Sequence, residues 1–156
     1  TFFNDKLIEI CMSWLSDIVH SIRKAAAENL HHLSEIFGED WTREQIVPRI
    51  KDLHSNAAFA KRMTSLYALR VLMVGGRGSK WSLCGEVLLP MLLTMAADPV
   101  ANVRFTAAKS LIEVAPLYKG DLTQSTEISA VLSKLNSDFD RDVRHYAAKA
   151  ISALAD

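Results

Sequence analysis

Four arginines recur through this chain at nearly constant intervals of 39, 42 and 40 residues. Each stands six residues after Asp or Asn, three residues before a small residue and seven residues before an aliphatic one. The arginines are Arg23, Arg62, Arg104 and Arg144. The residues around them are Asp17, Asn56, Asp98 and Asp138, then Ala26, Ser65, Ala107 and Ala147, then Leu30, Leu69, Leu111 and Ile151. A period of about 40 residues, repeated in register, is typical of a repeat architecture.

Each period also contains two segments whose apolar residues follow the i, i+3, i+4, i+7 spacing of an amphipathic helix. In the first period these segments are residues 7–15 and 22–37. Pairs of helices at a period of about 40 residues indicate HEAT or armadillo repeats. We therefore predict an all-α fold, a right-handed α-α superhelix (HEAT-repeat solenoid) of about four helix pairs. The repeats are 3–38, 41–76, 79–117 and 121–156, in one domain that we interpret as a fragment of a longer solenoid.

Composition excludes several classes of partner. The 18 basic and 18 acidic residues give a formal net charge of zero, so no overall field attracts nucleic acid or an anionic membrane. The longest uncharged apolar run, residues 87–97, is shorter than the roughly 20 residues that a membrane-spanning helix needs. Cys11 and Cys84 are too far apart for a metal-binding pair, and we expect both to be reduced core residues.

Glycines and prolines mark irregular points in the helices. Gly38 is placed to end a helix, and Thr42 with Gln45 fits a capping box for the next one. Pro48 and Pro90 both stand 14 residues before their arginine and should kink the first helices of the second and third repeats. The outer repeats have Glu9 and Ala130 there, so their first helices should be straighter. The segment 75–80 is rich in glycine but lacks the order of a phosphate-binding loop, and we interpret it as a link between repeats.

The repeated Asp and Arg have different expected roles. An Asp just before a helix accepts hydrogen bonds from backbone N–H groups. The Arg in the first turn of that helix has no comparable local role in this interpretation. We therefore expect each Arg to contact the Asp of a neighbouring repeat, which would form a ladder along the turns.

No group of residues predicts catalysis or a metal site. His31 and His32 lie near Glu28 and Glu35, but adjacent histidines point in different directions and no set completes a tetrahedral site. No nucleophile follows a strand, and no strand is predicted. We predict no enzyme activity, no catalytic residue, no metal and no cofactor. Among the tryptophans, Trp14 is expected in the core, and Trp41 and Trp81 are expected to pack between repeats and to be at most half exposed.

Several segments resemble one family of HEAT proteins, the scaffold (A, regulatory) subunits of serine/threonine protein phosphatase 2A. The segments are residues 98–105, 108–111, 11–15, 22–23, 37–38, 41 and 62–64. The register resembles the last four repeats of that family. The segment 75–80 and the missing proline at Ala130 depart from its pattern.

The resemblance implies a non-catalytic scaffold that binds the phosphatase catalytic subunit through the turns joining the two helices of each repeat. It also implies that a regulatory B subunit binds through repeats absent from this chain. The turn residues carried over by position are Val19, His20, Ser21, Phe59, Arg62, Pro99, Val100, Asn102, Arg104, Arg141 and Asp142. We expect no nucleic-acid or membrane partner, and we expect the protein in the cytoplasm with the nucleus as a second location.

Three other functions compete with this interpretation. A HEAT-repeat nuclear transport receptor fragment would bind protein cargo and would favour an acidic concave face. A nucleic-acid-binding solenoid would need a basic stripe, against which the zero net charge argues. An enzyme is the least supported of the three, because no catalytic constellation is present.

Overall fold

The computed structural model describes residues 2–75 and 80–155, apart from the side chains of residues 2–4 and 20. Within this part of the chain the regular structure is entirely helical, which confirms the predicted all-α solenoid fold class. The chain divides into two compact units, Thr1–Cys84 and Gly85–Asp156, and each is described by itself. The single-domain organisation stays a prediction. No helix among the described residues is both long enough and apolar enough to cross a membrane.

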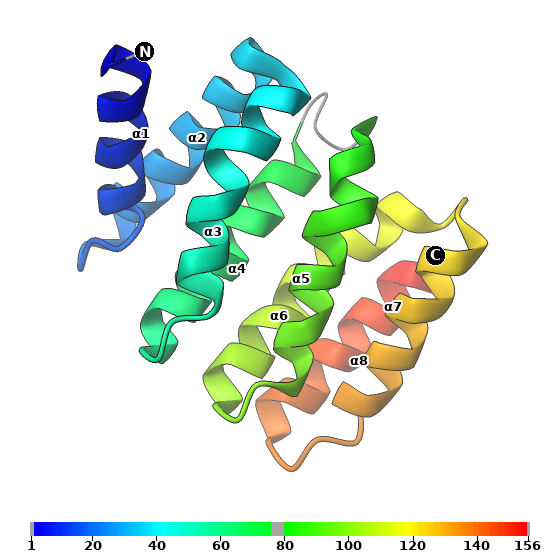
Figure 1. Ribbon diagram of the computed structural model, residues 1–156. Coiled ribbons are helices and arrows are strands. Elements are labelled where there is room, and N and C mark those ends of the chain that lie inside the picture. The colour runs from blue at the N-terminus through cyan, green and yellow to red at the C-terminus, as the bar shows by residue number, and fades with distance from the viewer. Residues whose placement is uncertain (1, 76–79, 156) are drawn as a thin grey trace. The chain divides into compact units, whose positions relative to one another are not determined.

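The first unit contains two helix pairs (Figure 1). The first pair is α1 (Phe2–Trp14) and α2 (His20–Trp41). The second pair begins with a π-helical segment, η1 (Thr42–Ile46), which continues into α3 (Val47–His54) and is followed by α4 (Phe59–Val74). Helix α4 packs against both α3 and α2, so the apolar sides of three helices meet in one core.

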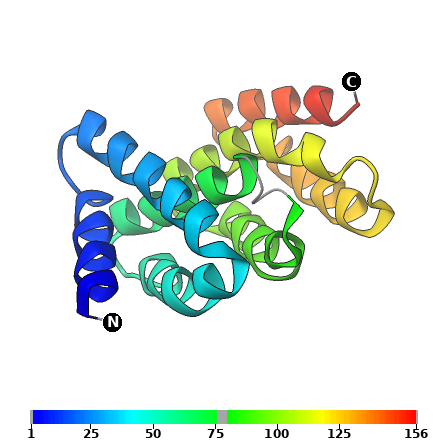
Figure 2. The ribbon, with the colours of Figure 1, turned by 90° about the horizontal axis from the view of Figure 1, so that it is seen from above.

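The second unit contains the other two pairs. Its first helix consists of the π-helical η3 (Cys84–Leu88), α5 (Leu89–Thr94) and the 3-10 turn η4 (Met95–Ala97). Then come α6 (Ala101–Val114), the 3-10 turn η5 (Ala115–Tyr118), α7 (Leu122–Leu135) and α8 (Arg141–Ala155). Helices α5 and α7 form one layer, and α6 and α8 form the layer behind it (Figures 1 and 2).

The repeated sequence positions have the predicted places in these helices. Helices α2, α4, α6 and α8 begin three residues before Arg23, Arg62, Arg104 and Arg144, as predicted. All four small residues after these arginines are fully buried, which lets neighbouring helices approach closely. The aliphatic residues Leu30, Leu69 and Leu111 are also fully buried. Ile151 is 38% exposed, because α8 is the last helix and no further described helix covers its far side.

The first helices of the second and third repeats are irregular next to their prolines, while the kink expected there stays a prediction. Pro48 and Pro90 are each the second residue of an α-helix, α3 or α5, and each follows a five-residue π-helical segment. Proline has no N–H to donate to the preceding turn and its ring crowds that turn, so the helix widens there. The corresponding helices with Glu9 and Ala130, α1 and α7, are uninterrupted.

Several local predictions were wrong. Thr42 does not form a capping box; its hydroxyl donates to the Gly38 carbonyl at 2.8 Å, four residues back, because η1 continues directly from α2. Trp14 is 46% exposed and not in the core. Ile22 and Phe37, the two ends of the apolar segment predicted at 22–37, are 38% and 42% exposed. Phe37 instead stacks on Trp41, with ring centroids 4.7 Å apart. Most of the segment 75–80 lies outside the described residues.

The carboxylate of Glu39 links the start of the third repeat to the end of α2. Its Oε1 accepts hydrogen bonds from the Ser82 hydroxyl at 2.8 Å and the Leu83 backbone N–H at 2.7 Å, and it lies 3.4 Å from Arg43. Partial burial opposes ionisation, but these hydrogen bonds and Arg43 outweigh it and lower the pKa of Glu39.

Both cysteines are buried free thiols, as predicted. Burial, with a smaller contribution from the nearby negative charge of Glu39, raises the pKa of Cys84 to about 12. Burial also raises the pKa of Cys11. Because the thiolate is the reactive form, neither cysteine is suited to redox or nucleophilic chemistry.

Gly38 ends the first part of α2 through its backbone conformation. Its φ of 89° lies in the left-handed region, and the chain turns there before it continues through η1. An added Cβ would meet no atom within 4 Å, so the strain of any other residue would come from the backbone alone.

We therefore expect Gly38→Ala to lower the free energy of unfolding by about 1–2 kcal/mol. Gly120→Ala is the matched control, because a Cβ there also meets nothing within 4 Å and no strained φ is involved. The control should be neutral or slightly stabilising. Urea unfolding followed by circular dichroism measures both variants, and equal stabilities would contradict the role given to the Gly38 backbone.

Candidate partner-binding turns

The four turns that join the helices of each repeat share one backbone arrangement. In each, the side chain of the repeated Asp or Asn accepts a hydrogen bond from the backbone N–H two residues later. We call these segments, residues 17–19, 56–58, 98–100 and 138–140, the intra-repeat turns. The four distances are 2.8, 3.0, 2.8 and 2.9 Å for Asp17, Asn56, Asp98 and Asp138. Such side-chain turns hold the backbone in a fixed bend ahead of a helix.

The repeated arginine completes each turn. Its Nη1 donates to two successive backbone carbonyls, those of the residues six and five positions earlier. The distances are 2.7 and 3.0 Å for Arg23, 2.9 and 2.9 Å for Arg62, 2.9 and 3.2 Å for Arg104, and 2.6 and 2.9 Å for Arg144. The expectation that the arginine has no local role was therefore wrong, because it satisfies carbonyls that the bend leaves outside any helix.

The predicted contact between neighbouring repeats is present in the second unit. Arg104 Nε and Nη2 donate to the two carboxylate oxygens of Asp138 at 2.7 and 2.9 Å, a paired geometry that fits the planar guanidinium. The two side chains are 17% and 11% exposed. The hydrogen bonds from Arg104 lower the pKa of Asp138, although burial opposes this, and the same bonds raise the pKa of Arg104.

Among the described residues of the first unit there is no equivalent ion pair between turns. Asn56 stands where the other turns have Asp, so Arg23 has no carboxylate to pair with in the following turn. The turn geometry itself is unchanged, since the Asn56 amide oxygen accepts the Ala58 N–H.

The predicted binding residues lie in or directly after these turns, and most are exposed. Val19 and Phe59 are each 45% exposed. The exposed polar and small members are Ser21, Pro99, Asn102, Arg141 and Asp142. Arg62, Val100 and Arg104 are half-buried because they also form the turns. His20 begins α2, and its side chain lies outside the described part.

The Arg104–Asp138 contact brings the predicted residues of the third and fourth turns to one edge of the second unit. In the first unit, the turns before α2 and α4 lie at the same end of their helix pairs (Figure 1).

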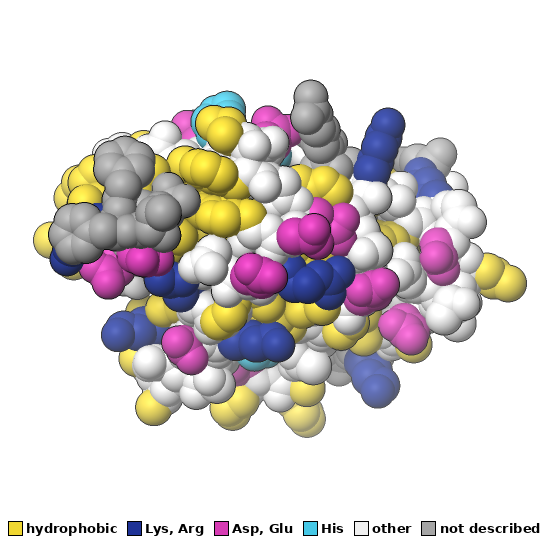
Figure 3. Space-filling view, turned by 45° about the horizontal axis from the view of Figure 1, so that its top comes forward, with side chains coloured by type: hydrophobic (Ala, Val, Ile, Leu, Met, Phe, Trp, Pro, Cys, Tyr) yellow, Lys and Arg dark blue, Asp and Glu magenta, His cyan; other side chains and the backbone are white. Residues whose placement is uncertain are grey.

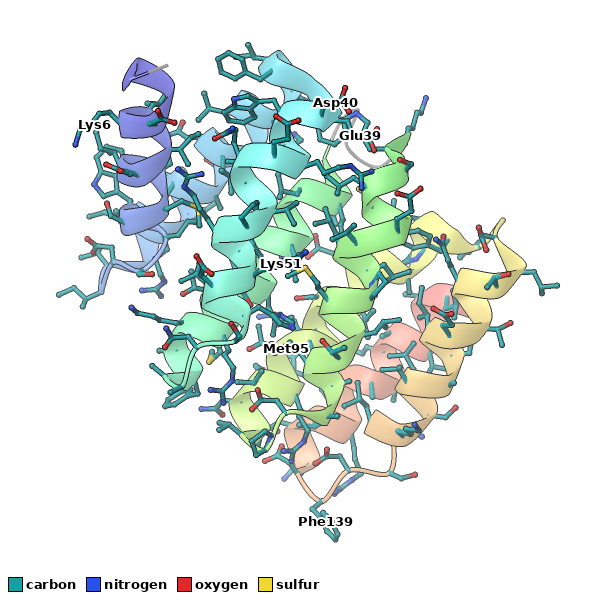
Figure 4. All side chains as sticks on the ribbon, viewed as in Figure 1. Lys6, Glu39, Asp40, Lys51, Met95 and Phe139 are labelled. Atoms are coloured by element: carbon teal, nitrogen blue, oxygen red, sulfur yellow. The ribbon has the colours of Figure 1, made fainter. Side chains whose placement is uncertain are left out.

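Sequence reasoning missed the most exposed side chains of the turns. Phe139 and Ile18 are 103% and 95% exposed, and both stand five residues before a repeated arginine. Figure 4 shows Phe139 pointing away from the helices. The arginine holds the carbonyl of that residue inward, so its side chain is directed outward. Ala57 and Pro99, at the same position in the other turns, are exposed too, so the fixed offset from the arginine was a usable signal.

Charge on the molecule is mixed. Figure 3 shows acidic and basic side chains interspersed on the face drawn there, without a broad area of one sign. Among the described residues no group of three His, Cys, Asp or Glu side chains could hold a metal ion. Within each unit the turns therefore present unlike side chains on a fixed backbone, which suits the recognition of another protein.

Comparison with known proteins gives a family and several relatives. The family model described as "Vacuolar 14 Fab1-binding region" matches residues 60–155. The chain is 37% identical to the A-type regulatory subunit of protein phosphatase PP2A from Saccharomyces cerevisiae over 127 residues, which are 77% of this chain and 20% of that protein. It is 46% identical to the PP2A 65 kDa regulatory subunit of Drosophila melanogaster over 61 residues, 39% of this chain and 10% of that protein. The chain thus spans a fifth or less of these relatives.

Solved structures support the fold alone. An engineered protein aligns with a TM-score of 0.58 at 19% identity, covering 95% of this chain and 62% of that one. A designed armadillo repeat protein in complex with the peptide (KR)4 also aligns with a TM-score of 0.58, at 18% identity, covering 92% and 62%. Both similarities place the chain among helical repeat proteins.

Proposed function

We propose that this chain, which belongs to the HEAT-like repeat family described as the Vacuolar 14 Fab1-binding region, is a non-catalytic scaffold. Its proposed partner is the catalytic subunit of protein phosphatase 2A, because its relatives are named as regulatory subunits of that phosphatase. The binding surface is the set of intra-repeat turns. The complete assembly is a heterotrimer, in which a regulatory B subunit binds repeats outside this chain. We place the protein in the cytoplasm, with the nucleus as a second location.

The observation that carries the proposal is the identical construction of the four turns. Each is fixed by an Asp or Asn side chain and by an arginine, while the residue five positions before the arginine is exposed. A rigid turn loses little conformational entropy on binding, which favours its use as a recognition surface. The relatives named as PP2A regulatory subunits support the choice of partner.

Isothermal titration with the purified catalytic subunit of protein phosphatase 2A tests the proposal directly. We expect saturable binding without phosphatase activity from the chain alone. The family description suggests Fab1 as a second bait, titrated under the same conditions. No binding to the phosphatase subunit, or binding to Fab1 alone, would overturn the proposed partner.

Asn102 is expected to contribute to docking and not to folding. It is exposed in the first turn of α6, and its backbone carbonyl accepts from the Thr106 hydroxyl, a bond that Asn102→Ala preserves. We expect Asn102→Ala to weaken binding of the catalytic subunit by about fivefold, the loss of about one interfacial hydrogen bond. Thr123→Ala, on the exposed start of α7 at the opposite end of the helix pair, is the control. Equal affinities for the two folded variants would remove Asn102 from the interface.

A further inference from the structure

A group of aromatic and basic side chains lies on α6 and α8, apart from the intra-repeat turns. The rings of Phe105 and Tyr146 meet edge to face, with centroids 4.9 Å apart and an interplanar angle of 82°. The ammonium groups of Lys109 and Lys149 lie 5.8 and 5.2 Å from the centroid of the Tyr146 ring. His145 also places its ring edge against Tyr146, at 5.2 Å. We call these five residues the Tyr146 cluster.

The cluster is accessible. Lys109, Lys149 and His145 are exposed, and the two larger rings, Phe105 and Tyr146, are half-buried. Their inner parts are fixed by the close packing of α6 on α8, the most extensive helix contact of the second unit. The aromatic surface is thus held rigid, while its outer part remains open to a ligand.

Both lysines of the cluster place their charge beside an aromatic ring. Neither lysine forms an ion pair with any acidic side chain in the described part of the chain. Instead, both ammonium groups approach the same ring, whose electron-rich face attracts a cation. Two like charges beside one ring repel each other, and an anion bound between them would relieve that repulsion.

Acidic residues limit the basic area to about two helical turns. On α8, Asp142 lies one turn before Tyr146, and on α6, Glu113 lies one turn after Lys109. A ligand that fits must therefore carry its negative charge over a short length. It must also present an apolar surface next to that charge, because Phe105 and Tyr146 lie beside the lysines.

We propose that the Tyr146 cluster binds a short acidic peptide segment of a protein, with a carboxylate between Lys109 and Lys149 and an adjacent apolar side chain against Phe105 and Tyr146. This site is separate from the turns and would be occupied independently of them. A single-stranded nucleic acid is the competing ligand class. It is less favoured because the acidic residues at both ends of the cluster would repel a continuous phosphate backbone.

Fluorescence anisotropy with a fluorescein-labelled peptide of alternating glutamate and leucine tests the proposal. We expect saturable binding that weakens as salt is added, because exposed charges are screened. The double charge reversal Lys109→Glu with Lys149→Glu should weaken binding at least about tenfold, the combined effect of two ion pairs. Tyr146→Ala should weaken it about fivefold, and Tyr146→Phe, which keeps the ring, should bind nearly as the parent does.

Three controls make the outcome decisive. Lys119→Glu changes the charge at an exposed lysine outside the cluster and should leave the affinity unchanged. Thermal melts confirm that each variant is folded. A peptide with lysine in place of glutamate should not bind.

Absent peptide binding, unchanged affinity of the folded double variant, or tighter binding of an oligothymidine of equal charge would overturn the proposal. Competition by the phosphatase catalytic subunit is measured separately, so failure at this site and failure of the turns are distinguishable.

Discussion

Replacing Arg104 with alanine is expected to lower the free energy of unfolding by about 2–4 kcal/mol, the largest stability loss among the turn residues. The substitution removes a two-oxygen ion pair with Asp138 and two hydrogen bonds to the carbonyls of Asp98 and Pro99. It also leaves the mostly buried Asp138 carboxylate without its guanidinium. Thermal and urea unfolding of the parent and the variant measure the loss.

Two further variants separate the contributions to that loss. Arg144→Ala removes the same pair of turn hydrogen bonds without an ion pair to a following turn, so it should cost about 1–2 kcal/mol less than Arg104→Ala. Asp138→Asn keeps the turn, as Asn56 does in the second repeat, and removes only the charge. If Asp138→Asn were as stable as the parent while Arg104→Ala was not, the turn hydrogen bonds, and not the ion pair, would account for the effect.

The ion pair between Arg104 and Asp138 also makes the free energy of unfolding depend on pH. The pKa of Asp138 is lower in the folded chain than in the unfolded chain, chiefly because Arg104 donates two hydrogen bonds to it. A lowered folded pKa contributes stability that is present above the unfolded value, roughly pH 4, and is lost as the pH falls through the folded value. The Asp138→Asn variant should therefore lose less stability than the parent on acidification below about pH 4.

Most of the fold could be predicted because the repeat fixes both the helix pairs and their register. The burial of Leu30, Leu69 and Leu111 follows from one position in the period, and the interruptions at Pro48 and Pro90 follow from the missing N–H of proline. Trp14 was misplaced because periodicity tells which residues share a helix face, but not whether another helix covers that face.

The turns were predicted in position and misinterpreted in mechanism. The regular spacing of the arginines identified Arg104 and its Asp partner in the next repeat, because four copies in register indicate a contact that recurs between repeats. It could not show that the same guanidinium also binds two carbonyls of its own turn, since backbone carbonyls carry no sequence signal. The outward direction of Phe139 was not predicted either. It depends on how Arg144 holds the carbonyl of that residue, and its only mark in the sequence is the fixed offset of five residues from the arginine.

That outward direction makes Phe139 the turn residue whose loss should affect docking most. Its side chain is fully exposed, so it contributes little packing to the folded chain, and a partner can cover nearly all of its apolar surface. Aromatic side chains are enriched in the buried centres of protein interfaces. We expect Phe139→Ala to weaken binding of the phosphatase 2A catalytic subunit by about 2 kcal/mol, which is about 30-fold in Kd.

The exposed Leu122 at the start of α7 provides the matched control for this change. It is 83% exposed and lies in the same unit, at the opposite end of the helix from the fourth turn. Leu122→Ala should leave the affinity unchanged, and neither variant should change the melting temperature by more than about 2 °C, since surface substitutions of this kind alter stability by less than about 0.5 kcal/mol. Binding of Phe139→Ala as tight as that of the parent would show that the fourth turn lies outside the interface. Equal losses would instead place the contact on the outer surface of α7 as well, because only a partner that reaches both ends of that helix could sense both side chains.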